Sequence, residues 1–272
     1  MKHFILPEDF KGEELTINNG KDFHYLSHVL RLREGDTLNG IDKNGNPYRL
    51  IILAVNDKHI RLKPLKNTSS ASVQNFINAN RPLMPHINLY QCMPKGKKMD
   101  IIIRQATEMG VSSITPVISR YTVPVLETDA KIKIKLKRWE RIAKEAAQQS
   151  GAQKIPQINT PVLLQDIKDV KSEKPAEIFI FFHPDPKTGT DLHKILSGKP
   201  DIVGILIGPE GGFSAEEVNS LKRKGLYAAY LGGTILRAET AAVYSTAAVK
   251  IILFEKNSWK IHNDLETEYE TS

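Results

Sequence analysis

The feature that most restricts the fold is a regular alternation of strand-like and helix-like segments in the second part of the chain. Five short segments are apolar on almost every residue, as strands covered on both faces must be. These segments are Ile87–Cys92, Ser113–Ile118, Ile178–His183, Ile202–Ile207 and Ala228–Leu231. Strands that alternate with helices form a mainly parallel sheet, so we expect an α/β domain.

The segments between these strands carry apolar residues at helical spacing. One stripe runs from Met99 to Met109 before Gly110, and another runs from Leu136 to Ala147 before Gly151. A glycine after the last apolar residue is a common helix end, because it readily adopts the left-handed conformation. We therefore predict helices that end at these two glycines.

The N-terminal part of the chain has short β-like runs instead. Thr37–Asp42 and Tyr48–Val55 flank Asn44-Gly45, a dipeptide suited to a hairpin turn. Asp22–Arg33 has the pattern of a short helix followed by a strand. These pieces predict a small β-barrel. The expected domains are the barrel over residues 1–70, a polar linker over 71–82, the α/β domain over 83–262 and an acidic tail over 263–272.

The charge balance favours a polyanionic partner. The 272 residues include 38 Lys and Arg against 31 Asp and Glu, a formal net charge of +7. Cationic surfaces favour nucleic acid, because each phosphate contact releases condensed counterions. A basic protein with an ordinary solvated surface is an equal alternative at this point.

Several classes of protein are disfavoured by composition. Cys92 is the single cysteine, so the chain has no intrachain disulfide and no paired-thiol metal site. No apolar run approaches the roughly 20 residues that cross a bilayer. No His, Cys and Asp cluster has metal-ligand spacing. We expect a cytoplasmic protein without a membrane segment or a metal.

The strongest chemical signal is Ile205–Glu217, with the sequence ILIGPEGGFSAEE. A buried strand ends at Gly208, a glycine-rich turn follows, and a helix begins. Ser214 and Glu217 have the spacing of a capping box, and Phe213 and Val218 that of a hydrophobic staple. The turn therefore lies at the carboxyl end of a strand, where open α/β sheets bind ligands.

The turn Gly208–Gly212 does not match the common nucleotide motifs, because it lacks both GxGxxG and GxxxxGK[ST] spacing. Its glycines allow close approach of backbone to a ligand. Glu210 would repel a phosphate but suits a cation such as a sulfonium or an ammonium. An ordinary strand–helix turn is the alternative interpretation.

A second motif, Leu231–Ala242, repeats this arrangement with the sequence LGGTILRAETAA. Glycines follow a short strand, and Arg237 and Glu239 flank the start of a small-residue helix predicted over Ala241–Phe254, with Thr240 as its N-cap. The alternative is that Arg237 and Glu239 form a surface ion pair of little consequence. Two such loops on neighbouring strands are expected to frame one pocket.

These two motifs resemble the second and third signature motifs of SPOUT-class RNA methyltransferases. The chain is similar above all to the ribosomal RNA small subunit methyltransferase E family, which methylates uridine N3. The resemblance extends over nearly the whole chain except the tail. Other matching positions are Lys95-Gly96, Gln105 to Gly110, Ser119-Arg120, Arg138-Trp139, Glu145 to Gly151 and, in a PUA-like RNA-binding barrel, His24, Val29 to Arg31 and Gly35-Asp36.

The resemblance implies a trefoil-knotted SPOUT domain with a mainly parallel sheet, preceded by the PUA-like barrel. It implies a homodimer that uses S-adenosylmethionine and acts on small-subunit (16S) ribosomal RNA. The residues expected to bind the cofactor are Phe182, His183, Ile207, Gly208, Glu210, Gly211, Gly212, Leu231, Gly232, Ile235, Leu236, Arg237 and Thr240.

The expected catalytic residues are Arg237 and Glu210. Methylation of uridine N3 requires loss of a proton, and a guanidinium suits the resulting anion because it is permanently charged and forked. Glu210 is expected to attract the sulfonium or to orient Arg237; a general-base role is the weaker alternative. His24, His28 and His183 are expected to be structural or pocket-lining.

Contacts to RNA are expected from basic residues and one amide, each of which could equally be solvated surface. They are Arg31, Arg33, Lys95, Arg120, Arg138, Arg141, Lys144 and Gln149. Gln149 lies one helical turn from Glu145, so these two are expected to act as a pair. The alternative functions are a ribose 2′-O RNA methyltransferase, a non-catalytic RNA-binding or ribosome-assembly factor, and an enzyme that uses a nucleoside triphosphate or dinucleotide.

Overall fold

The computed structural model describes residues 4–7, 9–42, 46–65, 85–122, 128–152, 154–170, 177–198 and 200–255. The chain forms two compact units, one of residues 1–81 with 147–154 and the other of residues 82–146 with 155–272. The expected linker over 71–82, the acidic tail over 263–272 and the Asn44-Gly45 turn lie outside the described residues, and the domain limits stay a prediction.

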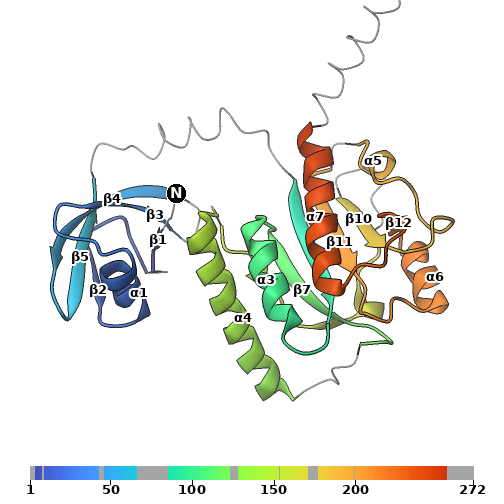
Figure 1. Cartoon of the computed structure of the whole chain (residues 1–272), viewed down its shortest axis with the longest axis horizontal. Coiled ribbons are helices and arrows are strands. Elements are labelled where there is room, and N and C mark those ends of the chain that lie inside the picture. The colour runs from blue at the N-terminus through green and yellow to red at the C-terminus, as the bar shows by residue number, and fades with distance from the viewer. Residues whose placement is uncertain are drawn as a thin grey trace, which may run out of the picture. The chain divides into compact units, whose positions relative to one another are not determined.

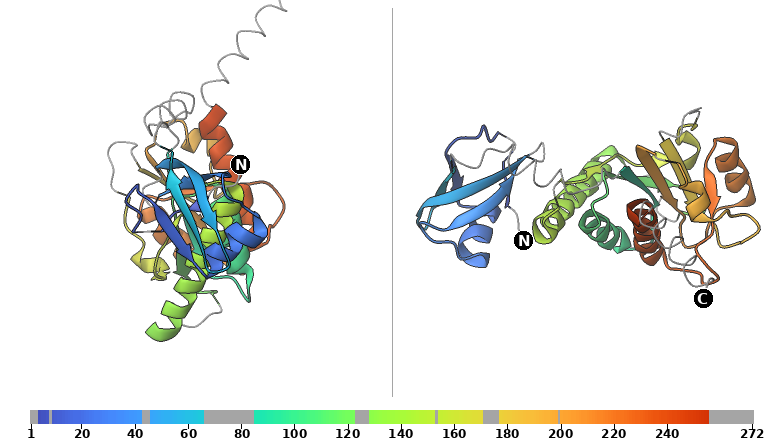
Figure 2. Two further views of the ribbon diagram at one scale, coloured as in Figure 1. Left: turned by 90° about the vertical axis from the view of Figure 1, so that its left-hand side faces the viewer. Right: turned by 90° about the horizontal axis from the view of Figure 1, so that it is seen from above.

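The first unit contains a five-stranded sheet in the order β1-β3-β4-β5-β2. The expected hairpin strands are present, since β3 and β4 pair antiparallel with Thr37 opposite Ile51. Alternate residues such as Leu50 and Ile52 point inward and are buried. The sheet is strongly curved (Figure 2). Its strands are β1 (Phe4–Ile5), β2 (Leu15–Asn18), β3 (Thr37–Ile41), β4 (Pro47–Val55) and β5 (His59–Pro64).

One expectation for this unit is wrong. Helix α1 (Lys21–His24) continues into a π-helical turn, η1 (Tyr25–Val29), but no strand follows it before Arg33. The backbone N–H groups of Leu30 and Leu32 both donate back to η1, at 2.9 Å to Tyr25 O and 3.1 Å to Leu26 O. Because these donors are used locally, the segment does not pair with the sheet.

The second unit contains a seven-stranded sheet whose main path runs β12-β10-β11-β6-β7-β8, with β9 paired to β7 (Figure 1). Every recorded strand pair in it is parallel. The mainly parallel α/β sheet is therefore confirmed. Its strands are β6 (His86–Cys92), β7 (Ser113–Ile118), β8 (Gln157–Ile158), β9 (Val162–Leu163), β10 (Glu177–Phe182), β11 (Ile202–Ile207) and β12 (Tyr227–Ala229).

Helices cover both faces of this sheet (Figure 2). On β11, Ile205 belongs to the core under α3, α4 and α7, whereas Leu206 belongs to the core under α6. Successive strand residues point to opposite faces, which is why a run apolar at every position forms the central strand. The helices are α3 (Lys98–Glu108), α4 (Asp129–Ser150), η2 (Leu164–Asp166), α5 (Leu192–Ile195), α6 (Ala215–Arg223) and α7 (Ala238–Glu255).

The strand order decides where the two glycine loops meet. The expectation that the two loops follow neighbouring strands is wrong, because β10 lies between β11 and β12. All three strands run in the same direction. Their carboxyl ends therefore share one edge of the sheet, and the loops after β11 and β12 come out beside the end of β10.

Candidate active site

A cavity of about 320 Å³ lies at this edge of the sheet. Three segments enclose it: the end of β10, the loop after β11 and the loop between β12 and α7. The two glycine motifs thus frame a single cavity, as expected. The lining residues are Phe182, His183, Pro184, Ile207, Gly208, Pro209, Glu210, Gly211, Gly212, Phe213, Leu231, Gly232, Thr234, Ile235, Leu236, Ala238 and Ala241.

Of the residues expected to bind a cofactor, Arg237 and Thr240 are absent from this lining. Thr240 is also not the N-cap, because α7 begins at Ala238. The backbone carbonyl of Arg237 accepts from the N–H of Ala241 at 2.8 Å, so the helix starts before Thr240. The buried side chain of Ala238 anchors this first turn.

Some lining residues were not predicted. They are Pro184, Pro209, Phe213, Thr234, Ala238 and Ala241. All lie within or directly beside the motifs, so proximity in sequence was the available signal.

Glycine backbone opens part of the cavity wall. Gly212 and Gly232 have φ angles of +68° and +111°, which other residues adopt with strain. A Cβ built on either would meet no atom within 4 Å, so the space beside both backbones is free. At Gly208, by contrast, a Cβ would lie 3.2 Å from the Phe213 ring, which packs against this glycine.

The start of α6 fixes the loop that precedes it, and the expected capping box is present. The Glu217 backbone N–H donates to Ser214 Oγ at 3.3 Å, and the Ser214 N–H donates to Glu217 Oε2 at 2.8 Å. The other carboxylate oxygen of Glu217 accepts from the N–H of Arg120 at 2.8 Å. Phe213 packs against the core cluster that contains Val218, as a hydrophobic staple requires.

An ionic network connects this loop to two helices. Lys98 Nζ, at the start of α3, donates to Glu210 Oε1 at 2.8 Å and lies 3.7 Å from Glu239 Oε2 on α7. The backbone N–H of Lys95 also donates to Glu210 Oε1, at 3.4 Å. Lys98 was not predicted as a site residue, since its partners are distant in sequence.

These contacts determine the charge of Glu210. Partial burial acts to raise the Glu210 pKa, but hydrogen bonds from Lys98, from its own backbone N–H and from that of Lys95 outweigh it, so the pKa lies below 4.5. The hydrogen bond to Glu210 is the main cause that raises the pKa of Lys98. Both groups are therefore charged near neutral pH.

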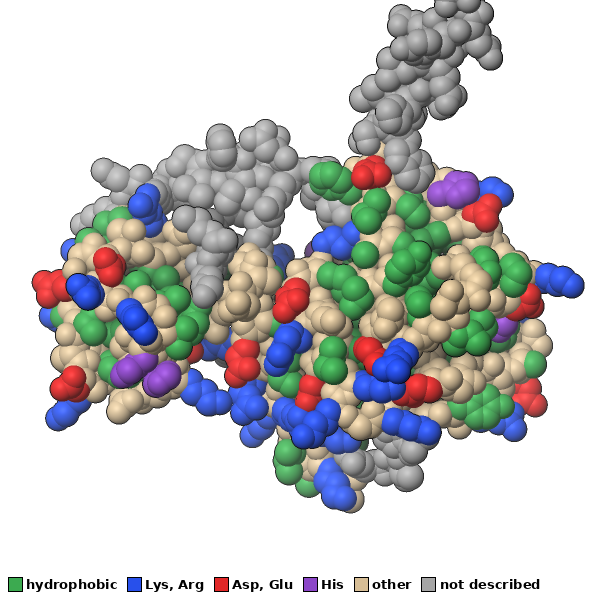
Figure 3. Space-filling view, in the orientation of Figure 1, with side chains coloured by type: hydrophobic (Ala, Val, Ile, Leu, Met, Phe, Trp, Pro, Cys, Tyr) green, Lys and Arg blue, Asp and Glu red, His purple; other side chains and the backbone are tan. Residues whose placement is uncertain are grey.

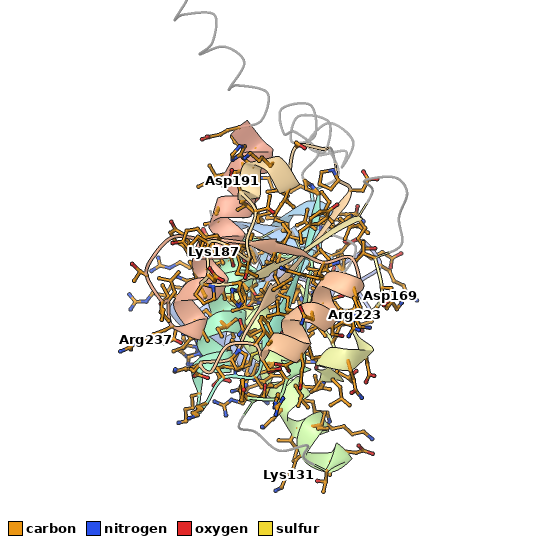
Figure 4. The ribbon with its side chains drawn as sticks, turned by 90° about the vertical axis from the view of Figure 1, so that its right-hand side faces the viewer. Lys131, Asp169, Lys187, Asp191, Arg223 and Arg237 are labelled. Atoms are coloured by element: carbon orange, nitrogen blue, oxygen red, sulfur yellow. The ribbon has the colours of Figure 1, made fainter. Side chains whose placement is uncertain are left out.

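Arg237 is exposed at the start of α7 and reaches outward (Figure 4). Within the described part of the chain its side chain has no recorded ion pair or hydrogen bond. The alternative of an Arg237–Glu239 surface pair is wrong, because Glu239 pairs with Lys98.

The residues expected to contact RNA are divided between the two units. Arg31 and Arg33 are exposed in the first unit, where Arg31 has a positive φ of 54°. The N–H of Arg33 donates to Asp36 Oδ2 at 2.7 Å. Lys95 is exposed beside the cavity loop, and Gln149 is exposed near the end of α4.

Three other expected RNA contacts, all arginines, lie near carboxylates of their own unit. Arg120 pairs with Glu216 at 2.7 Å, and Arg138 pairs with Asp100. Arg141 lies 3.6 Å from Glu145, so the recorded partner of Glu145 is Arg141, where Gln149 was expected. Lys144 is half-buried and already engaged in an interaction.

The three histidines discussed above lie in two places, and their roles stay a prediction. His183 lines the cavity, and the rings of His24 and His28 stack with centroids 4.7 Å apart. Within the described residues, no group of three or more His, Cys, Asp or Glu side chains is arranged to hold a metal ion. None of the described helices is long and apolar enough to span a membrane.

Comparison with known sequences identifies the family. The sequence model of an RNA methyltransferase domain matches residues 81–250, and that of an RNA methyltransferase PUA domain matches residues 17–65. The chain is 31% identical to the ribosomal RNA small subunit methyltransferase E of Bacillus subtilis over 85% of its own length and 87% of that protein. The chain belongs to the ribosomal RNA small subunit methyltransferase E family. A second member, methyltransferase E 2 of Borreliella burgdorferi, is 29% identical over 94% of this chain and 100% of that protein.

Solved structures of this family share the fold. The methyltransferase E of Neisseria gonorrhoeae, bound to S-adenosyl methionine, superposes with a TM-score of 0.74 at 24% identity and covers 93% of this chain and 98% of that chain. A probable rRNA-methyltransferase from Porphyromonas gingivalis gives a TM-score of 0.73 at 21% identity with the same coverage. The PUA-like first unit and the SPOUT-like second unit are therefore those of the family.

Proposed function

We propose that this methyltransferase transfers a methyl group from S-adenosylmethionine to N3 of a uridine in small-subunit (16S) ribosomal RNA. The observation that carries the proposal is the single cavity formed by the two glycine loops, with the Glu210 carboxylate in its wall. The names of the relatives supply the class of RNA. The N3 position comes from the family resemblance.

The cavity fits the proposed donor in size and chemistry. Its volume of about 320 Å³ is that of a small-ligand site. Phe182, Ile207 and Leu231 supply apolar walls for an adenine ring, and the open backbone at Gly212 and Gly232 allows close approach. When bound, S-adenosylmethionine supplies an activated methyl group on a positively charged sulfur.

The role proposed for Arg237 follows from the substrate. The N3 proton of uridine has a pKa about two units above neutral, which corresponds to roughly 3 kcal/mol at pH 7. The anion that forms carries its charge on the two flanking carbonyl oxygens. A guanidinium without an ion pair is suited to stabilise that charge. Arg237 follows a residue that lines the cavity, and no ion pair is recorded for it within the described part of the chain.

We assign Glu210 an electrostatic role. A carboxylate with a lowered pKa is a weak base, so Glu210 is poorly matched to remove the uridine proton. Its negative charge beside the cavity favours a sulfonium over a neutral or anionic ligand.

The test combines product analysis with one substitution. Small-subunit particles lacking the modification are incubated with the protein and labelled donor, and the RNA is digested to nucleosides. We expect 3-methyluridine. We expect Arg237→Ala to lower kcat at least about 100-fold, the effect of removing a charge-stabilising donor, while donor Kd changes less than about threefold. Arg223→Ala, an exposed arginine at the end of α6, is the matched control.

Other products separate the alternatives. A 2′-O-methylated nucleoside would replace the N3 assignment with ribose methylation. Failure of the folded protein to bind the donor in calorimetry would favour a non-catalytic RNA-binding factor. Unchanged turnover in Arg237→Ala would remove this residue from the mechanism.

We also propose that the protein is a homodimer through α7. The inner face of this helix buries mostly small residues such as Ala242 and Ser245. Its outer face exposes Tyr244, Ile251 and Phe254, the last to 61%, and hydrophobic side chains gather over this part of the surface (Figure 3). Large apolar side chains exposed together mark an interaction surface, so a second copy is the expected cover.

Light scattering tests the dimer. We expect a dimer for the wild type and a monomer for the double variant Tyr244→Glu, Ile251→Glu. The control is Ile134→Glu, which changes a comparably exposed residue on α4. A monomeric wild-type protein would contradict the proposal.

The remaining features of the resemblance belong to the same proposal. They are a trefoil knot near the C-terminus, a cytoplasmic location where ribosomal RNA is found, and RNA contacts from Arg31, Arg33, Lys95, Arg120, Arg138, Arg141, Lys144 and Gln149. Arg31, Arg33 and Lys95 are the best supported of the charged contacts, because they are exposed and no ion pair is recorded for them within the described residues.

A further inference from the structure

Four charged groups meet beside the cavity, and their pairing is selective. Lys98 contacts both carboxylates, Glu210 at 2.8 Å and Glu239 at 3.7 Å. Arg237 lies close enough to lower the pKa of Lys98. Even so, Arg237 has no recorded ion pair within the described chain. The two acids are thus held by the lysine, although one of them is only two residues from the arginine.

The Glu239 carboxylate depends strongly on its ion pair with Lys98. Glu239 Oε2 is buried and accepts no hydrogen bond within the described residues. The ion pair with Lys98 is its recorded charge compensation. A buried anion without a partner is costly, so loss of the lysine would drive Glu239 toward another cation. Arg237 is the nearest in sequence, and a guanidinium binds carboxylates in bidentate fashion.

Lys98 is badly placed to stabilise its own helix. It is the first residue of α3, where the positive end of the helix dipole disfavours a cation. Its side chain is only about one-third exposed and spans the start of α3, the loop after β11 and the start of α7. This arrangement is explained by what Lys98 does for the site rather than for the helix.

We propose that Lys98 is a positioning residue that occupies the Glu210 and Glu239 carboxylates and so keeps the Arg237 guanidinium available to the substrate. The inference rests on the proposed function, because it assigns Arg237 a partner in the substrate. The inference adds a requirement that the two glycine loops alone do not reveal. The site needs the Lys98 ammonium to pair with the carboxylates so that the Arg237 guanidinium stays unpaired.

The test uses four variants of the full chain: Lys98→Met, Lys98→Arg, the double variant Lys98→Met with Glu239→Gln, and Lys97→Met as a matched control one residue away. Two readouts are compared. The first is kcat in the methylation assay together with donor Kd by calorimetry. The second needs neither donor nor RNA: it is the rate at which phenylglyoxal modifies Arg237, followed by peptide mass spectrometry, because arginines paired with carboxylates react slowly.

We expect Lys98→Met to lower kcat about 30-fold with donor Kd changed less than about threefold, an effect on charge stabilisation in the transition state rather than on ground-state binding. We expect its Arg237 to react at least about threefold more slowly with phenylglyoxal, since the guanidinium is then paired with a carboxylate. Lys98→Arg keeps both carboxylates paired and is expected to stay close to wild type. The double variant removes one competing acid and is expected to recover at least part of both losses. Lys97→Met is expected to match wild type.

Unchanged Arg237 reactivity in Lys98→Met would overturn the inference. So would a double variant no better than Lys98→Met in both readouts, because this would make Lys98 a purely structural contact. Thermal midpoints identify a variant that is merely unfolded. If Lys98→Met is unfolded, Lys98→Gln, which also removes the charge but keeps a polar side chain, replaces it in the comparison. If the wild-type protein methylates another position, the N3 assignment is removed but the comparison of the Lys98 variants still holds. A wild-type protein without any turnover would overturn the proposed function and the Lys98 inference together.

Discussion

A substitution of Glu217 tests which hydrogen bonds fix the loop between β11 and α6. Its carboxylate accepts two backbone N–H groups, from Ser214 at 2.8 Å and from Arg120 at 2.8 Å. Glu217→Gln keeps one carbonyl oxygen, so one of these hydrogen bonds is lost and the other changes from charged to neutral. Hydrogen bonds to charged groups contribute about 1.5–3 kcal/mol and neutral ones about 1 kcal/mol. We expect the free energy of unfolding to fall by about 2 kcal/mol.

The measurement is thermal unfolding followed by circular dichroism. For a unit of 150–250 residues, 1 kcal/mol corresponds to about 2–4 °C, so the midpoint is expected to fall by about 4–8 °C. The control is Glu216→Gln on the same turn, whose exposed side chain makes only a surface ion pair with Arg120 and should change the stability by less than about 0.5 kcal/mol. Equal midpoints for the two variants would refute the reasoning that Glu217 fixes the loop.

Two further predictions test the core and a helix end. Burial raises the pKa of the Cys92 thiol to about 12. Since the thiolate is the reactive form, we expect the folded protein to resist alkylation even at pH 9. Once the chain is unfolded in urea, we expect the thiol to react at an ordinary rate. Rapid alkylation of the native protein at pH 9 would contradict this. Gly225→Ala should lower the free energy of unfolding by about 1–3 kcal/mol. At this position φ is +84°, and the new Cβ would lie 2.7 Å from Val170 O. The control is Gly12→Ala, which is also at positive φ but has no atom within 4 Å of the new Cβ, so it separates the clash from the backbone strain.

Elements with a strong pattern of their own were predictable. The β11 run is apolar at every position except Gly204, and the Ser214–Glu217 capping box is complete within four residues. Both elements could therefore be predicted from a few neighbouring residues. The family followed from the two glycine motifs. The strands β1 and β2 were missed because they are two and four residues long and exist only through pairing with β3 and β5.

Local rules also gave two errors at helix ends. A Thr N-cap at position 240 was plausible, but inward packing of Ala238 starts α7 earlier. The strand expected after η1 failed because the donors of Leu30 and Leu32 bond back to the preceding helical turns. In both cases the choice among locally acceptable conformations depended on packing or on hydrogen bonds that residue preference does not specify.

By itself, the sequence determined the type of most elements of the second unit, the two glycine loops and the family, because periodicity, capping and glycine placement act over a few residues. Only the tertiary structure decided which charges pair. Lys98 donates to Glu210, which is 112 residues away in the sequence. Glu239 forms its ion pair with the same lysine and not with Arg237, two residues before it. Such choices depend on distance and burial in three dimensions, since electrostatic attraction falls with separation and strengthens where water is excluded.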